Sequence, residues 1–425
     1  MELKKSIIRP SIGSLVPSAT LLINERSKEL ISQGKKVFRL GFGQSPFPIP
    51  AEVVDSLRHY AGEKDYLPVQ GLMPLRKAVS DYYKSYLQLE YPINQIMIGP
   101  GSKELILGLK MVCDADVLLP SPSWVSYEPQ AHIVNSNVYW IDAEEKDGWR
   151  ITPEKLDTVC KNCSDKQKIL ILNYPSNPVG VTYSKKDLKA LSEVARKHAL
   201  IVVADEIYGA LTFEGSHHSL ASFYPEGTIV SSGLSKWCGA GGWRLGTFCF
   251  PKELSEVLSA MMALASESFS AVSAPVQYAA IKAFEGSQAI EEHVKNSKKV
   301  LEMVAGYVYS ELIEMSVTMP KAEGGFYLFP NFKNFKKALS KKGVNTSAEF
   351  CETLLVETGV ALLPGSAFGR PAEEITCRLS YVDFDGAELL RVITESPEID
   401  QHSLIDHCPS MKESMAVLKQ WLKAL

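Results

Sequence analysis

Residues 229–246 read Ile-Val-Ser-Ser-Gly-Leu-Ser-Lys-Trp-Cys-Gly-Ala-Gly-Gly-Trp-Arg-Leu-Gly. One amine, Lys236, lies in a turn of small residues after a β-branched run, and one guanidinium, Arg244, follows it. A lysine that forms a Schiff base needs a partly dry setting, because burial lowers its pKa and frees the lone pair of the amine. An arginine set off by glycines can bind a phosphate ester, because glycines let the backbone approach a ligand closely. A Schiff-base lysine beside a phosphate site indicates pyridoxal 5'-phosphate (PLP).

Around this stretch, short apolar runs alternate with helical patterns. Strands separated by helices favour βαβ units and a mostly parallel sheet, so the predicted fold class is α/β. Ligands of such sheets bind beyond the carboxyl ends of the strands. Helical patterns are expected at residues 103–113, 186–198 and 252–263. The predicted strands are residues 117–119, 138–141, 169–173, 200–204, 229–232 and 246–250.

The composition limits the class of protein. The chain has 425 residues, of which 45% are apolar, so it can form a large core in more than one domain. Its 45 basic and 49 acidic side chains nearly balance and form no basic stripe, so nucleic acid is not an expected partner. The eight dispersed cysteines are typical of free thiols in a reducing compartment. Because no apolar run is long enough for a signal peptide or a membrane span, we expect a cytoplasmic protein without a membrane partner.

Polar residues follow the predicted strands at positions where a ligand would bind. Asp205 comes directly after the apolar run at 200–204, where a carboxylate is costly unless it meets a partner. Asn177 begins an Asn-Pro-Val-Gly turn just beyond the strand at 169–173. Backbone N–H groups at a helix N-terminus bind anions. The turn Gly-Pro-Gly-Ser-Lys at 99–103 precedes a helical pattern, so the phosphate candidates there are Gly101, Ser102 and Lys103.

The stretch from Gly233 to Gly246 resembles the lysine-attachment motif of the class I/II aminotransferases, PLP enzymes of fold type I in the aspartate aminotransferase superfamily. The resemblance covers residues 15–393 and the last helix. It implies a large domain, whose mostly parallel seven-stranded sheet is flanked by helices, and a smaller α+β domain. We expect the large PLP-binding domain at residues 56–310 and the small domain at 311–425, joined by an N-terminal segment at 1–55.

The resemblance also implies three catalytic residues. Lys236 would hold PLP as an internal aldimine and, once an amino acid displaces it, would move the proton between the substrate Cα and the cofactor. Asp205, in Asp-Glu-Ile-Tyr, would pair with the pyridine nitrogen, because a protonated nitrogen makes the ring an electron sink. Tyr208, from the same motif, would bind the phenolic oxygen of the cofactor together with Asn177.

Further residues are implied as binding groups. Trp124 would stack on the pyridine ring, and the phosphate would meet Arg244 and the 101–103 turn. Gly233 stands where relatives often have a serine, so the phosphate hydroxyl would come from Ser232 or Ser235. On the substrate side, Arg378 would clamp the α-carboxylate in a bidentate pair, a geometry that lysine does not offer, with help from Gly43 and Asn177.

The implied reaction moves an α-amino group from an L-amino acid to a 2-oxo acid, for which 2-oxoglutarate is expected, as in the biosynthesis and metabolism of amino acids. A cation for a second substrate carboxylate is missing where relatives place one, because Met111 and the Ser-Glu-Ser-Phe-Ser stretch at 266–270 stand there. This favours a neutral or aromatic donor without excluding aspartate. Tyr66 matches a tyrosine that reaches the phosphate of the other subunit, so the resemblance implies a homodimer with shared active sites.

Two alternatives and two unassigned features accompany this interpretation. A PLP-dependent lyase, catalysing β- or γ-elimination, would use the same fold and would release its product without an acceptor. A regulatory binding protein would usually carry an additional DNA-binding module. Cys160 and Cys163 form a single C-x-x-C in a predicted helix, and no metal is expected there. Residues 394–410 form a predicted insertion before the last amphipathic helix.

Overall fold

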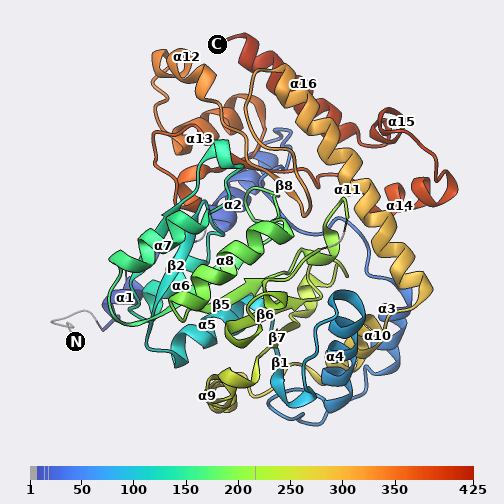
Figure 1. Cartoon of the computed structure of the whole chain (residues 1–425). Coiled ribbons are helices and arrows are strands. Elements are labelled where there is room, and N and C mark those ends of the chain that lie inside the picture. The colour runs from blue at the N-terminus through green and yellow to red at the C-terminus, as the bar shows by residue number, and fades with distance from the viewer. Residues whose placement is uncertain (1–6, 14, 18, 216) are drawn as a thin grey trace, which may run out of the picture.

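The computed structural model describes residues 7–13, 15–17, 19–215 and 217–425, so residues 1–6 of the predicted N-terminal segment lie outside the described residues. Figure 1 shows a larger part built around one sheet and a smaller part, in orange and red, above it. Within the described ranges, no helix is long and apolar enough to cross a membrane.

A sheet of seven strands forms the centre of the larger part, in the order β1-β7-β6-β5-β4-β2-β3. Strands β3, β2, β4, β5 and β6 are parallel to one another, and β7 is antiparallel to both β6 and β1. The predicted mostly parallel sheet is therefore confirmed. Its strands are β1 (Ile96–Gly99), β2 (Ala115–Ser121), β3 (Val138–Asp142), β4 (Gln167–Asn173), β5 (Ile201–Asp205), β6 (Thr228–Gly233) and β7 (Gly246–Cys249).

The central strands are apolar on both faces because helices cover both faces of the sheet. In β4, Ile169 and Ile171 pack into one cluster with residues of α5 and α9, whereas Leu170 and Leu172 pack into another with residues of α7 and α8. This alternation follows from the twofold period of a strand, and it explains why parallel strands are continuous apolar runs in the sequence. Strand β1 was not predicted, although it is buried along its whole length.

Several helices begin where the local sequence supplies a side-chain cap. The Ser184 hydroxyl accepts from the backbone N–H of Asp187, whose carboxylate accepts from the N–H of Ser184, and this capping box starts α8. The helices are α1 (Pro10–Gly13), α2 (Ala19–Ser32), α3 (Ala51–His59), α4 (Met73–Leu87), α5 (Ser102–Val112), α6 (Tyr127–Ile133), α7 (Pro153–Asn162), α8 (Lys185–Lys197), α9 (Ser255–Ser266), α10 (Ala274–Glu285), α11 (Gln288–Glu314), α12 (Lys336–Lys341), α13 (Ser347–Thr358), α14 (Gly386–Glu395), α15 (Gln401–Asp406) and α16 (Pro409–Lys423).

The smaller part contains a three-stranded antiparallel sheet in the order β8 (Tyr327–Leu328), β10 (Cys377–Ser380) and β9 (Leu363–Pro364). The long helix α11, shown in gold in Figure 1, runs beside α16 and also contacts α14 and α15. Within the 394–410 segment, α15 buries Leu404 and Ile405 in this core, so the predicted insertion has a packing role.

The C-x-x-C pair belongs to the packing of α7. Cys160 is buried in the core between α7 and the sheet, and Cys163 lies partly buried at the end of the helix. Burial raises the pKa of the Cys160 thiol to about 11, which disfavours the reactive thiolate. Among the described residues, no cluster of His, Cys, Asp or Glu could hold a metal ion.

Candidate active site

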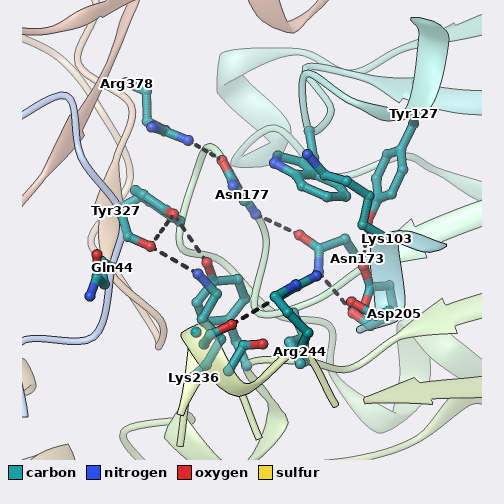
Figure 2. Close-up of a pocket in the computed structure, with 18 residues that line it drawn as sticks. Gln44, Lys103, Tyr127, Asn173, Asn177, Asp205, Lys236, Arg244, Tyr327 and Arg378 are labelled. Atoms are coloured by element: carbon teal, nitrogen blue, oxygen red, sulfur yellow. Dashed lines mark hydrogen bonds between the residues drawn. The ribbon is translucent and has the colours of Figure 1, made fainter. Parts of the chain in front are cut away.

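A cavity of about 650 Å³ opens beyond the carboxyl ends of β4, β5 and β6, where the larger part faces the smaller one (Figure 2). Its size is typical of small-molecule sites. The structure brings most of the predicted site residues to this one cavity. Those that line it are Gly43, Ser102, Lys103, Trp124, Asn177, Asp205, Tyr208, Ser235, Lys236, Arg244 and Arg378.

The floor of the cavity is set by the ends of two neighbouring strands. Asn173 and Asp205 are register partners at the ends of β4 and β5, and the Asn173 side chain donates to the Asp205 backbone carbonyl over 2.8 Å. The same side chain accepts from the backbone N–H of Asn177 over 2.7 Å, which fixes the turn that carries Asn177. The parallel pairing of the two strands thus places the predicted carboxylate and amide together.

Asp205 is a buried carboxylate with a hydroxyl donor. Burial raises its pKa to about 6, although hydrogen bonds oppose this shift, chiefly that from Tyr127. The Tyr127 hydroxyl donates to Oδ2 of Asp205 over 2.5 Å. A buried carboxylate with a raised pKa is poised to meet a cationic partner. Sequence reasoning missed Tyr127, because nothing in its local pattern distinguishes it from a core tyrosine at the start of α6.

An anion site lies at the N-terminus of α5. Among the described residues no side chain caps this helix, so its first N–H groups face the cavity. Gly101 has φ +94°, and a Cβ there would lie 2.2 Å from Nη2 of Arg244. The Arg244 guanidinium is held by the carbonyls of Gly241 and Pro100, at 2.9 and 3.2 Å, and its own backbone is left-handed at φ +56°. Of the two candidate serines, Ser235 lines the cavity and Ser232 does not.

Lys236 lies in the loop after β6 with its amine inside the cavity. Its Nζ donates to the backbone carbonyl of Gly43 over 2.8 Å. The rings of Tyr208 and Phe326 lie 5.3 and 5.5 Å from Nζ, measured to their centroids. Burial, followed by the positive charges of Arg378 and Arg244, lowers the pKa of Lys236, although Tyr327 and Asp205 oppose this. A lowered pKa increases the fraction of Lys236 that is neutral, the form in which an amine is a nucleophile.

Arg378 enters the cavity from β10 and is itself only 2% exposed. Its Nη1 donates to Oδ1 of Asn177 over 3.0 Å, its Nη2 donates to the Gly41 carbonyl over 2.7 Å, and its guanidinium lies 4.5 Å from the centroid of the Tyr327 ring. Among the described residues Nε has no hydrogen-bond partner. A buried guanidinium with an unused donor can bind a carboxylate. The sequence interpretation missed Tyr327, although its Gly-Gly-Phe-Tyr context marks an unusual turn.

These groups fit PLP. Among the residues that the structure describes, four basic side chains line the cavity, Lys103, Lys236, Arg244 and Arg378, and one carboxylate, Asp205. A group that carries a phosphate and a protonated ring nitrogen would complement this arrangement, with the phosphate at the α5 N-terminus and the nitrogen at Asp205. The close approach of Arg244 to Gly101 leaves no room for a side chain at the anion site.

The predicted distal-carboxylate position and the predicted inter-subunit tyrosine lie outside this cavity. Met111 is exposed, and Lys110 is buried with its amine donating to the Tyr127 carbonyl over 2.7 Å. Tyr66 is 97% exposed and does not line the cavity. Neither Lys110 nor Met111 therefore supplies a cation to the site, and Tyr66 is available to a second molecule.

Comparisons with known proteins agree with this geometry. A family model described as "Aminotransferase class I and II" matches residues 35–394. The chain is similar to an aspartate aminotransferase of Geobacillus stearothermophilus, with 36% identity across 87% of this chain and 93% of that protein. It is also 33% identical to an asparagine–oxo-acid transaminase of Streptococcus mutans, across 86% and 92% of the two chains. A solved structure of Thermus thermophilus aspartate aminotransferase with maleate has a TM-score of 0.83 at 25% identity, covering 97% of this chain and all of that one.

Proposed function

Because this chain belongs to the class I and II aminotransferases, we propose that the cavity around Lys236 is its active site. The chain is a PLP-dependent transaminase of fold type I, acting on an amino acid and a 2-oxo acid. The observation that supports the site most directly is the convergence of Lys236, Asp205 and Arg378 on one cavity from three separate motifs. The lyase alternative is not favoured, because relatives across most of the chain are named as transaminases.

Each side chain of the proposed site has one task. Bound PLP supplies an electron-accepting ring that stabilises negative charge at the substrate Cα. Lys236 would hold the cofactor, and its free amine would take the Cα proton of the substrate and return it, since the lowered pKa lets this amine act as a base. Asp205 keeps the ring nitrogen protonated, and Tyr208 and Asn177 bind the phenolic oxygen. Arg378 holds the α-carboxylate so that the Cα–H bond faces Lys236.

The phosphate is assigned to the α5 N-terminus. The backbone N–H groups of Ser102 and Lys103, the Arg244 guanidinium and the Ser235 hydroxyl surround the anion site described above, with Gly101 keeping it open. Trp124 lines the same cavity and presents its ring beside the strand ends, so we assign it to stacking on the pyridine face. These assignments extend the roles that the resemblance implied.

We propose a dicarboxylic amino acid such as aspartate as the donor. The Lys103 side chain lies with Nζ 5.0 Å from the Trp124 ring centroid, and no described residue accepts a hydrogen bond from it. Burial, followed by the charges of Arg244 and Lys236, lowers its pKa, so it gains from an anionic ligand. After Arg244 is assigned to the phosphate and Arg378 to the α-carboxylate, Lys103 is the remaining cation for a second carboxylate. The names of the relatives also support aspartate.

Lys103→Met is expected to lower kcat/KM for aspartate by about 10- to 100-fold, the effect of one charged hydrogen bond, and to leave kcat/KM for alanine nearly unchanged. Steady-state kinetics with both donors measure this difference. Lys103→Arg is the matched control, because it keeps the charge and should keep most of the preference. Equal losses with both donors would show that the amine serves the cofactor phosphate instead.

We further propose a homodimer with shared sites. Tyr66 is an almost fully exposed aromatic residue, and Val16 and Met73 are also exposed apolar side chains. A second subunit would bury such side chains in an interface. If Tyr66 reaches the phosphate of the other subunit, Tyr66→Phe should weaken PLP binding by about 10-fold or more.

A mixed dimer tests this sharing directly. In a hybrid of Tyr66→Phe with the inactive Lys236→Ala, one site combines an intact Lys236 with an intact Tyr66 from the other subunit. Mixing the two proteins should therefore restore PLP affinity in one of the two sites of each hybrid dimer. Affinity that stays at the level of Tyr66→Phe after subunit exchange would contradict shared sites.

The remaining assignments concern the domains and the location of the protein. We propose a large PLP-binding domain at residues 56–310 and a small domain at 311–425 together with the N-terminal segment 1–55. The two sheets support this division, because one lies within residues 96–249 and the other within 327–380. A cytoplasmic location is supported by the eight cysteines, all of which are free thiols.

A further inference from the structure

Two buried phenols meet at the edge of the cavity. Tyr208 follows the end of β5, and Tyr327 comes from β8 in the other sheet. Their hydroxyl oxygens lie 3.0 Å apart, and each residue is only 2% exposed. Two phenols buried in contact can share one hydrogen bond, with either oxygen as the donor. The pair therefore connects the two sheets through a polar contact inside the active site.

The surroundings of Tyr327 are strongly cationic. Arg378 lies over its ring, and the Lys236 amine and the Tyr327 hydroxyl both point to the Gly43 carbonyl, at 2.8 and 3.5 Å. Burial alone would raise the pKa of Tyr327, but the charges of Arg378 and Lys236 and the hydrogen bond from Tyr208 outweigh it and lower this pKa. Burial and the contact with Tyr327 raise the pKa of Tyr208 instead. Tyr327 is therefore the more acidic phenol and the better donor.

The position of the Tyr327 hydroxyl is tightly constrained. A Cβ on Gly43 would lie 1.8 Å from this oxygen, so the close contact exists only because residue 43 is glycine. The oxygen is thus held against Tyr208 by the backbone of the segment that precedes α3. A hydroxyl that is fixed in this way can orient the hydroxyl proton of the neighbouring Tyr208.

In the PLP-loaded enzyme, the number of protons on the two phenols determines which of them donates the shared hydrogen bond. Each phenol has one proton and can also accept. In its proposed role, the Tyr208 hydroxyl donates a hydrogen bond to the phenolic oxygen of the cofactor. The Tyr208 oxygen can then accept a hydrogen bond from another donor. The hydroxyl in contact with that oxygen is the one of Tyr327, at 3.0 Å, whereas the other acceptor of Tyr327, the Gly43 carbonyl, is 3.5 Å away. The Tyr208 oxygen is therefore the closer acceptor for the single proton of Tyr327.

We propose that Tyr327 is a positioning residue that acts through Tyr208. It donates to the Tyr208 oxygen, and this contact directs the Tyr208 proton onto the phenolic oxygen of the cofactor. Because Arg378 lies on the Tyr327 ring, the same contact couples the carboxylate site to the cofactor. The inference rests on the role of Tyr208 in the proposed function.

The test is Tyr327→Phe in the PLP-loaded enzyme, with the pH midpoint of the visible absorbance band as the readout. Without the hydrogen bond from Tyr327, Tyr208 donates a weaker hydrogen bond, and more negative charge stays on the phenolic oxygen of the cofactor. The nitrogen that joins Lys236 to the cofactor should therefore keep its proton to higher pH. The midpoint should rise by roughly half to one pH unit, the net effect of one hydrogen bond. Tyr224→Phe is the matched control, since this buried phenol donates to the Leu200 carbonyl, away from the cavity, and should leave the midpoint unchanged.

A double-mutant cycle separates the possible outcomes. If Tyr327 acts through Tyr208, Tyr327→Phe should shift the midpoint in the wild type but not in a Tyr208→Phe background. Equal shifts in both backgrounds, or no shift in the wild type, would overturn the inference while leaving the role of Tyr208 intact. An unchanged midpoint in Tyr208→Phe alone would overturn the proposed role of Tyr208 and this inference with it.

The unloaded protein provides a second measurement that does not depend on PLP binding. Tyrosinate absorbance should show one tyrosine that ionises below the ordinary range, and this transition should disappear in Tyr327→Phe and persist in Tyr224→Phe. Persistence of the transition in Tyr327→Phe would show that Tyr327 is not the more acidic phenol and would overturn the arrangement of donors.

Discussion

Lys236→Ala is expected to lower kcat for transamination by more than about 10⁴-fold, because it removes both the amine that holds the cofactor and the base that moves the Cα proton. The anion site at the α5 N-terminus stays intact in this variant. The protein should therefore fold and still bind PLP, but weakly. Steady-state kinetics measure the loss, and mass spectrometry after borohydride reduction measures covalent PLP, which should be present in the wild type and absent in the variant.

Lys252→Ala is the control for this prediction. Lys252 is an exposed lysine just after β7, and its loss should change neither kcat nor covalent attachment. Activity near the wild-type level in Lys236→Ala would remove Lys236 from the proposed site, and covalent PLP on another lysine would reassign the attachment point.

Asp205→Asn should have the second largest effect, and it should act on activity and stability in opposite directions. Loss of the carboxylate leaves the ring nitrogen unprotonated, so kcat should fall by about 10³-fold or more. In the unloaded protein the ionised Asp205 destabilises the folded state, because burial raises the pKa of this carboxyl from 3.8 to about 6. The variant should therefore abolish transamination while making the unloaded protein more stable at pH 8.

The pH dependence of this stability has a definite sign. A carboxyl whose pKa is higher in the folded state binds its proton more tightly there. Its stabilising contribution to the free energy of unfolding is therefore complete below pH 4 and is lost as the pH rises through 6. The free energy of unfolding of the unloaded protein should fall by about 3 kcal/mol over this window. In Asp205→Asn this component should be missing, which urea unfolding at pH 4, 6 and 8 would measure.

Asp116→Asn is the matched control. Asp116 is equally buried but lies near the amino end of β2, where Asn137 and Ser164 donate to it. Its replacement should leave kcat unchanged and should leave the Asp205 component of the pH dependence in place. If Asp205→Asn kept the wild-type pH dependence, Asp205 would not be the buried carboxyl that titrates near 6.

The elements that could be predicted are those with strong local patterns. β4 and β5 are runs of apolar residues buried on both faces, and such runs are recognisable without any tertiary information. The lysine stretch, the Asp-Glu-Ile-Tyr motif and the Arg-Leu-Ser-Tyr motif are likewise contiguous in the chain. The parallel sheet brings the first two motifs together, because it aligns strand ends that are far apart in sequence. Arg378 of the third motif reaches the same cavity from β10 in the other sheet.

Other features needed the tertiary structure. The direction of the Lys103 side chain, which bears on the donor, depends on its packing against Trp124 in a different loop. Ser235 lines the cavity and Ser232 does not, because Ser232 lies within β6 whereas Ser235 lies in the loop after it.

By itself, the sequence determined the fold class and the chemistry that the site can perform, because residue type and local periodicity are properties of contiguous segments. Only the tertiary structure decided which distant residues contact one another in the site. Tyr327 and Gly43 are separated by 284 positions along the chain, and Tyr127 and Asp205 by 78. Contacts of this kind depend on how distant segments of the chain pack together, and no short stretch of sequence carries that information.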